Sequence, residues 1–250
     1  MRKVLVAVSI ILTLLSNATA STNWADLQRQ APDLDLQLIE SASLSLHILS
    51  ESSVTLQPKG TVVILPDYQQ HAFSPRLLNT LRLHLPAAGW NVLVMPAPET
   101  SEQISPEQKL LQQKSQLAAR WQLLNQQGNL QNPVIVIAQG ETAALLNLLV
   151  AEALATRPAA IVNLGAYLTD QQQNNQLLKQ VALTPLPLLD LITAVDHPHA
   201  TATTQQRQLV ARAQQNSLYR QRYLSEARQD QPMQQWLIKE ILGWLQTNGF

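Results

Sequence analysis

The stretch 133–150 constrains this chain more than any other, because it reads as a strand that turns directly into a helix. Residues 134–138 form a continuous apolar run, which is typical of a strand buried on both faces of a parallel sheet. A helix-forming run begins at Glu141, so only Gln139 and Gly140 separate the two elements. Glycine tolerates the left-handed backbone of a sharp turn. The sequence therefore predicts a tight strand–helix turn with Gly140 at its apex.

Strands and helices alternate along the rest of the chain. Apolar and polar residues alternate over 34–51, which predicts an antiparallel hairpin at a sheet edge. Further strands are expected over 61–65, 90–95, 134–138, 159–164, 186–194 and 218–224, and helices over 76–88, 105–125, 141–156, 174–182, 205–215 and 233–246. This order predicts an α/β fold: a mostly parallel sheet that carries the antiparallel N-terminal hairpin and has helices on both faces.

The N-terminus has the pattern of a secretory signal peptide. Basic residues Arg2 and Lys3 precede an apolar run over 4–15, and Ala18-Thr19-Ala20 is a small-residue cleavage motif. An uncleaved membrane anchor is the alternative, but the run is shorter than the ~20 residues of a transmembrane helix. We expect cleavage after Ala20, a periplasmic protein with no integral membrane span, and one α/β domain over 21–250.

Composition excludes several classes of function. The chain has 17 basic and 17 acidic residues, so it lacks the positive charge that nucleic-acid binding requires. It has no cysteine, which excludes disulfides, thiol catalysis and cysteine-based metal sites. We expect no cofactor and no nucleic-acid partner.

Short motifs along the chain resemble those of the DUF3530 family of exported proteobacterial proteins, which is grouped with α/β-hydrolase-like proteins. These motifs are Leu65-Pro66-Asp67 followed by His71, Leu81-Arg82, Gly89-Trp90, Asn174-Asn175, Pro187-Leu188-Leu189-Asp190, Tyr219-Arg220-Gln221 and Gly243-Trp244-Leu245. The resemblance covers nearly the whole mature chain. It implies an α/β-hydrolase-like fold and little about the chemistry.

The α/β-hydrolase pattern can be tested at the three positions of its catalytic triad. The small residues Ala138 and Thr142 flank the turn as that fold requires, but Gly140 stands where the serine nucleophile would be. Asp196 lies at the position of the acid. No histidine follows His199, so none is available after the last strand for Asp196 to orient. The pattern predicts a fold without serine-hydrolase activity.

Replacement chemistry at the same strand ends is an alternative, drawing on Asp67, His71, Glu141 or Asp196. We expect Glu141 to stabilise the positive N-terminus of its helix instead. A carboxylate at Asp67 would oppose a developing oxyanion, which argues against acyl transfer. The H-x-H motif of His197 and His199 beside Asp196 is a conceivable metal site. Three ligands so close in sequence rarely complete a tetrahedral shell, and we expect no metal.

Asp190 is unusual because it lies inside an apolar strand, where an unpaired carboxylate would be costly. We expect a buried Asp–Arg or Asp–Gln/Tyr pair that sets the strand register, with Arg220, Gln221 or Arg222 on the next strand as partner and Arg220 as the structural candidate.

The leading hypothesis is an α/β-hydrolase-like protein without a catalytic residue, which binds a small molecule or an envelope protein or acts as an accessory envelope protein. One alternative is an atypical hydrolase of ester or peptide-type substrates that uses non-serine chemistry near Gly140. The other is a scaffold of an envelope complex.

Overall fold

The computed structural model describes residues 29, 35–68, 70–71, 77–99, 104–152, 156–224 and 231–250. The expected signal peptide and its cleavage site lie outside these residues. In the described part of the chain, no helix is both long and apolar enough to cross a membrane.

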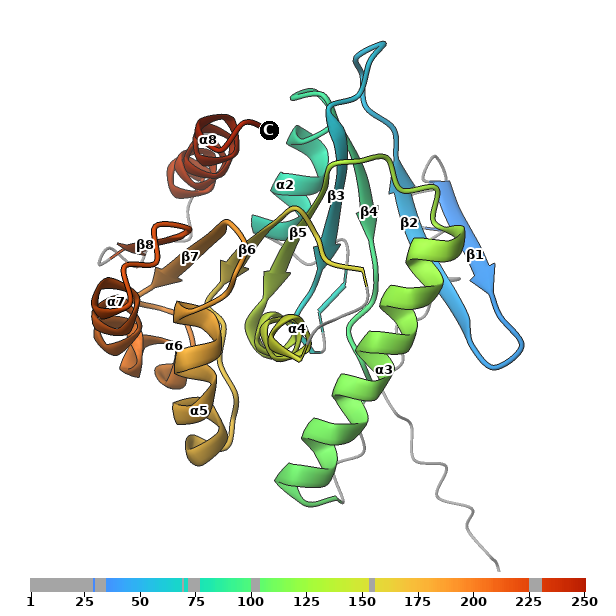
Figure 1. The fold of residues 1–250 in the computed structure, drawn as a ribbon. Coiled ribbons are helices and arrows are strands. Elements are labelled where there is room, and N and C mark those ends of the chain that lie inside the picture. Colours follow the sequence, from blue (N-terminus) through green and yellow to red (C-terminus); the bar gives the residue numbers. More distant parts are fainter. Residues whose placement is uncertain are drawn as a thin grey trace, which may run out of the picture.

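An eight-stranded sheet forms the centre of the molecule, in the strand order β1-β2-β4-β3-β5-β6-β7-β8 (Figure 1). Strands β1 and β2 form an antiparallel hairpin, and β2 pairs antiparallel with β4. All the other neighbours are parallel. The strands are β1 (Asp35–Glu40), β2 (Ser45–Glu51), β3 (Gly60–Leu65), β4 (Trp90–Val94), β5 (Val134–Gln139), β6 (Ala160–Leu164), β7 (Leu188–Thr193) and β8 (Tyr219–Leu224). This arrangement confirms the expected fold class.

Helices cover both faces of the sheet. Helices α2 and α8 pack on one face through leucine, isoleucine and tryptophan side chains, and α3, α4 and α5 bury their apolar residues against the other (Figure 1). The helices are α2 (Leu77–His84), α3 (Pro106–Gln127), α4 (Gly140–Ala151), α5 (Gln171–Ala182), α6 (Pro198–Ala202), α7 (Thr204–Ala213) and α8 (Gln231–Thr247). The sheet is therefore buried on both sides, as its continuous apolar strands require.

The structure corrects four details of the sequence prediction. Helix α4 ends at Ala151, before position 156, and helix α5 begins at Gln171, before position 174. Helix α2 ends at His84, short of Ala88, because Pro86 lacks the backbone N–H that a longer helix would need. The short helix α6 was not expected, since five residues are too few to show a helical period.

The carboxyl ends of the parallel strands β3, β5, β6 and β7 lie on the same side of the sheet. Open α/β sheets bind ligands at the carboxyl ends of their strands, because the loops that follow the strands converge there. Asp67 follows β3, Gly140 follows β5, Tyr167 follows β6 and His197 follows β7. The candidate site is built from these loops.

Candidate functional site

The turn between β5 and α4 has the geometry expected of a nucleophile elbow. Gly140 has φ +57°, in the left-handed region, and begins α4 directly after the extended residue Gln139. A Cβ atom at position 140 would overlap the carboxylate of Asp67. The side chain of Asp67 thus occupies the space in which a nucleophile at position 140 would begin.

The carboxylate of Asp67 is held by two backbone N–H groups. Its Oδ1 accepts from Tyr68 N at 2.9 Å and from Glu141 N at 2.8 Å. An oxyanion hole on this fold consists of the N–H after the nucleophile and an N–H from the loop following the third strand. Asp67 therefore fills the oxyanion-hole position with its own carboxylate. The sequence placed Asp67 in this loop, but it did not show that the carboxylate turns back over Gly140.

Burial raises the pKa of Asp67 from 3.8 to about 6. The two backbone N–H groups lower that pKa in part, and the nearby carboxylate of Glu141 raises it again. The hydroxyl of Tyr167 lies 3.5 Å from Oδ2 of Asp67 and donates toward it. Burial raises the pKa of Tyr167 too, and the charges of Asp67 and Glu141 add to this shift. Tyr167 is therefore a protonated donor at neutral pH.

Glu141 lies beside Asp67, but it has partners of its own. Its carboxylate is buried, with Oε2 3.3 Å from Nζ of Lys109 on α3 and Oε1 accepting from Oγ1 of Thr169 at 2.9 Å. Both oxygens are engaged, and the residue lies in the first turn of α4. These contacts fit the expected helix-stabilising role better than a nucleophile.

The side chain of Asp196 is held in the turn after β7. Its Oδ2 accepts from Thr193 N at 2.7 Å, and its Cγ packs against Gly165, where an added Cβ would come within 2.7 Å. Burial raises its pKa. Among the described residues no imidazole hydrogen-bonds to it. Asp196 therefore closes the turn after β7.

The two histidines of the H-x-H motif belong to an aromatic cluster. The ring of His197 stacks on Tyr167 with centroids 4.1 Å apart, and His199 meets His197 edge-on at 5.0 Å. The Nδ1 atom of His199 donates to the carbonyl of Leu168 at 2.8 Å. Over the ranges that the structure covers, no three His, Asp or Glu residues are arranged to hold a metal ion. His71 is half-buried in the loop after β3. The side chain that lies over Gly140 is that of Asp67, from the same loop.

The partner of Asp190 differs from the one expected. Asp190 is fully buried, with Oδ2 3.2 Å from Nη1 of Arg207 on α7, and it accepts from the Tyr219 hydroxyl at 2.8 Å. Arg220 contacts Glu240 of α8 instead, at 3.3 Å. The expectation that Arg220 is the partner was therefore wrong, although Asp190 does have an arginine partner and a tyrosine partner.

The sequence did not indicate Arg207 as the partner of Asp190, because an arginine in a polar helix is expected to be exposed to solvent. A weak signal was present, since Thr204, Arg207 and Ala211 recur at helical spacing and all three are buried in α7. Arg207 Nη2 also donates to the carbonyl of Ala166 at 2.7 Å, which ties α7 to the loop after β6.

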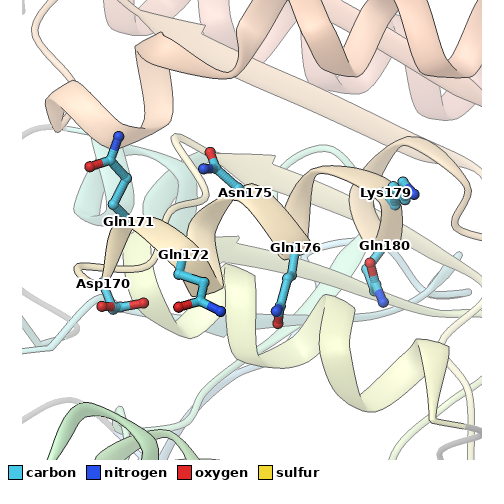
Figure 2. A pocket seen from close by; sticks show the side chains of 7 residues that line it. All are labelled: Asp170, Gln171, Gln172, Asn175, Gln176, Lys179 and Gln180. Atoms are coloured by element: carbon cyan, nitrogen blue, oxygen red, sulfur yellow. The ribbon is translucent and has the colours of Figure 1, made fainter.

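One hollow lies beside the first turn of α4, and a second one lies along α5. The first, of about 320 Å³, lies between the start of α3, the first turn of α4 and the loop that leads into α5; its lining residues include Lys109, Glu141, Thr169 and Asp170. The second, of about 790 Å³, follows the outer surface of α5 and is lined mainly by glutamine and asparagine side chains (Figure 2). Asp170 lines both hollows.

Comparisons with known proteins bear on the fold. A family model described as "Protein of unknown function (DUF3530)" matches residues 15–111 and 96–247. No curated protein matches the sequence.

Solved structures of hydrolases are similar in fold at low sequence identity. They include the esterase domain of a Rhodothermus marinus protein (13% identity, TM-score 0.60, 84% of this chain and 97% of that one). They also include a dienelactone hydrolase from Anabaena variabilis (12% identity, TM-score 0.63, 86% of this chain and 97% of that one). A third is a predicted CIB-like hydrolase from Thermoplasma acidophilum (11% identity, TM-score 0.61, 86% of this chain and 98% of that one). These similarities confirm the α/β-hydrolase-like fold.

Proposed function

The chain belongs to the DUF3530 family, and on this premise we propose that it is an exported α/β-hydrolase-like protein that binds a ligand and does not hydrolyse one. We further propose that residues 1–20 are a cleaved signal peptide and that residues 21–250 act as one domain in the periplasm.

The observation that carries this proposal is the position of Asp67. Gly140 offers no nucleophile, and the two N–H groups that would stabilise an oxyanion already bind the carboxylate of Asp67. A negative charge at this position opposes the charge that develops in acyl transfer. Among the residues that the structure describes, Asp196, the expected acid, has no imidazole partner.

For a direct test, the purified mature protein is incubated with a fluorophosphonate probe and, separately, with p-nitrophenyl esters. An active serine esterase serves as the positive control. We expect no labelling and no turnover above buffer. Labelling at a serine, or turnover that survives further purification, would contradict a non-catalytic role.

An atypical hydrolase is the second candidate, and the environment of Asp67 favours it over other replacement chemistry. One oxygen of this carboxylate is held by backbone N–H groups, while the other faces the hydroxyl of Tyr167. A pKa raised to about 6 is suited to a general base near neutral pH. If turnover were found, Asp67→Asn would abolish it under this hypothesis, whereas Asp196→Asn would leave it unchanged.

A scaffold role is the third possibility. The 320 Å³ hollow beside Glu141 favours binding over a purely structural role, because its volume lies at the lower end of the range typical of small-molecule sites.

A further inference from the structure

We propose that the hollow beside Glu141 binds a small uncharged amide with an aliphatic body, and that Gln113 of α3 recognises the amide group of this ligand. The inference rests on the proposed binding function and specifies the class of ligand. It is carried by the buried amide of Gln113, by the balanced charges of the hollow and by its apolar wall.

Gln113 is a buried polar side chain without a partner. It lines the hollow and is only 3% exposed. Within the part of the chain that the structure describes, its side-chain amide makes no hydrogen bond. A buried amide without a partner costs free energy, and such groups in folded proteins are normally bonded to water or to a ligand. Gln113 therefore points to a ligand group that can both donate and accept.

The place of Gln113 on α3 puts its amide at the inner end of the hollow. Four lining residues recur at helical spacing and so share one face of this helix: Pro106, Lys109, Leu110 and Gln113. One turn further along the same face, Leu117 already lies in the apolar core. A ligand that enters the hollow between the helices therefore meets the amide where the apolar core begins.

The charges around the hollow balance one another, which favours an uncharged ligand. Lys109 and Glu141 form an ion pair at 3.3 Å, and Thr169 donates to Glu141 at 2.9 Å. The first turns of α3, α4 and α5 each add a partial positive charge of about +0.5. Each of these helix ends already has a carboxylate, from Glu107, Glu141 and Asp170 respectively. A ligand anion thus finds no uncompensated helix end, and a ligand cation would compete with Lys109.

A primary amide is the uncharged group that complements Gln113 best. Its C=O and N–H groups lie side by side in one plane, as they do in the glutamine side chain. Two such amides can therefore form two hydrogen bonds at once. An alcohol offers its donor and its acceptor at a single oxygen and cannot pair with both atoms in the same way.

The rest of the hollow is suited to a hydrocarbon group. Ile104, Pro106, Leu110 and Leu168 supply apolar surface along its lining. A ligand that pairs its amide with Gln113 can bury a branched aliphatic body against this wall. We therefore expect isovaleramide to bind more tightly than acetamide, which has the same amide and almost no body.

The test is an NMR titration of the isotope-labelled mature protein with three ligands of the same carbon skeleton. Isovaleramide is uncharged, isovalerate is an anion and isoamylamine is a cation at neutral pH. We expect isovaleramide to saturate one site and to shift the side-chain NH₂ signal of Gln113. Each charged ligand should bind about tenfold more weakly or worse, because its charge would lose water without gaining a free partner. Acetamide serves as the control for the aliphatic body.

Gln113→Met is the informative variant, because methionine keeps the length of the side chain and removes its amide. It also identifies the Gln113 signal, which is lost from its spectrum. We expect isovaleramide to bind this variant about tenfold more weakly, with the melting temperature unchanged or higher, since no protein hydrogen bond is lost. Gln112→Met is the matched control: Gln112 is the preceding residue of α3, is exposed and lies outside the hollow. It should leave the affinity unchanged.

Four results would overturn the inference: an unmoved Gln113 signal with isovaleramide, equal binding of a charged ligand, equal binding of acetamide, or unchanged affinity in Gln113→Met. The first would mean that water alone satisfies the amide. The same spectra test the proposed non-catalytic function separately, because hydrolysis of isovaleramide by water would release isovalerate and ammonia. Their appearance would contradict that function and would leave the binding inference intact.

Discussion

At the scale of single residues, Asp67 and Gly140 depend on each other. The carboxylate lies over the glycine and accepts from the N–H of Glu141, directly after the glycine, and from the N–H of Tyr68 in its own loop. Neither residue can be exchanged without affecting the other. This dependence gives two predictions.

Gly140→Ala should destabilise the protein by about 2 kcal/mol or more, because alanine at positive φ costs roughly 1–2 kcal/mol and its Cβ also overlaps Asp67. The measurement is the free energy of unfolding in urea. Gly249→Ala is the control, since Gly249 has φ +86° with nothing within 4 Å of its Cβ and so carries the backbone cost alone. Equal losses in the two variants would show that Asp67 does not fill the site.

Asp67→Asn should become more stable relative to the wild type as the pH rises from about 4 to about 6. The folded protein retains the proton on Asp67 up to a pKa of about 6, whereas the unfolded chain releases it near 3.8. The folded state therefore binds more protons in this window, and ionisation of Asp67 costs stability as the pH rises through it. Allowing for partial exposure, we expect a change of about 1–2 kcal/mol in the difference between the two proteins.

The check is a series of urea unfolding curves at pH 4 to 7.5. The difference between the two proteins should level off above the folded pKa. A difference that stays constant across the series would mean that burial does not perturb the Asp67 carboxyl.

At the scale of elements, the Asp190–Arg207 pair joins a central strand to a covering helix. Asp190 lies in β7, opposite Asn163 of β6 and Gln221 of β8. Arg207 reaches it from α7 and also binds the loop after β6. One buried ion pair thus connects three elements at the end of the sheet farthest from β1.

Arg207→Met should cost about 3–5 kcal/mol, because it leaves a buried carboxylate without its charge partner. Arg220→Met is the control, since its contact with Glu240 is partly exposed and should contribute less than about 1 kcal/mol. The free energy of unfolding measures both effects. Similar costs for the two variants would contradict the assignment of Arg207 as the buried partner.

At the scale of the whole molecule, the hydrolase architecture is complete while the site at its strand ends is altered. The sheet order, the two helical layers and the strand–helix turn are all present. At those strand ends Gly140 stands at the apex of the turn, and the carboxylate of Asp67 lies over it. The fold by itself does not determine the reaction, because functional sites are built on folds that serve many purposes.

The proposed signal peptide predicts where the protein is found and at which residue the mature chain begins. When the full chain is produced with its N-terminus intact, we expect the mature protein to be recovered from the periplasm with Ser21 as its first residue, because the proposed signal peptide would be cleaved after Ala18-Thr19-Ala20. Mass spectrometry of the periplasmic fraction measures this. A membrane-bound protein of full mass would support the uncleaved anchor instead.

The sequence by itself determined the fold class, most strand and helix limits, the turn at Gly140 and the absence of a histidine after His199. These features are carried by local periodicity, by glycine and by position along the chain. Only the tertiary structure decided which side chains meet. Asp67 and Gly140 are brought together by two loops distant in sequence, and Arg207 reaches Asp190 from a helix that looks exposed. Side-chain direction across packed layers leaves no local pattern in the sequence, because it depends on how the layers are stacked.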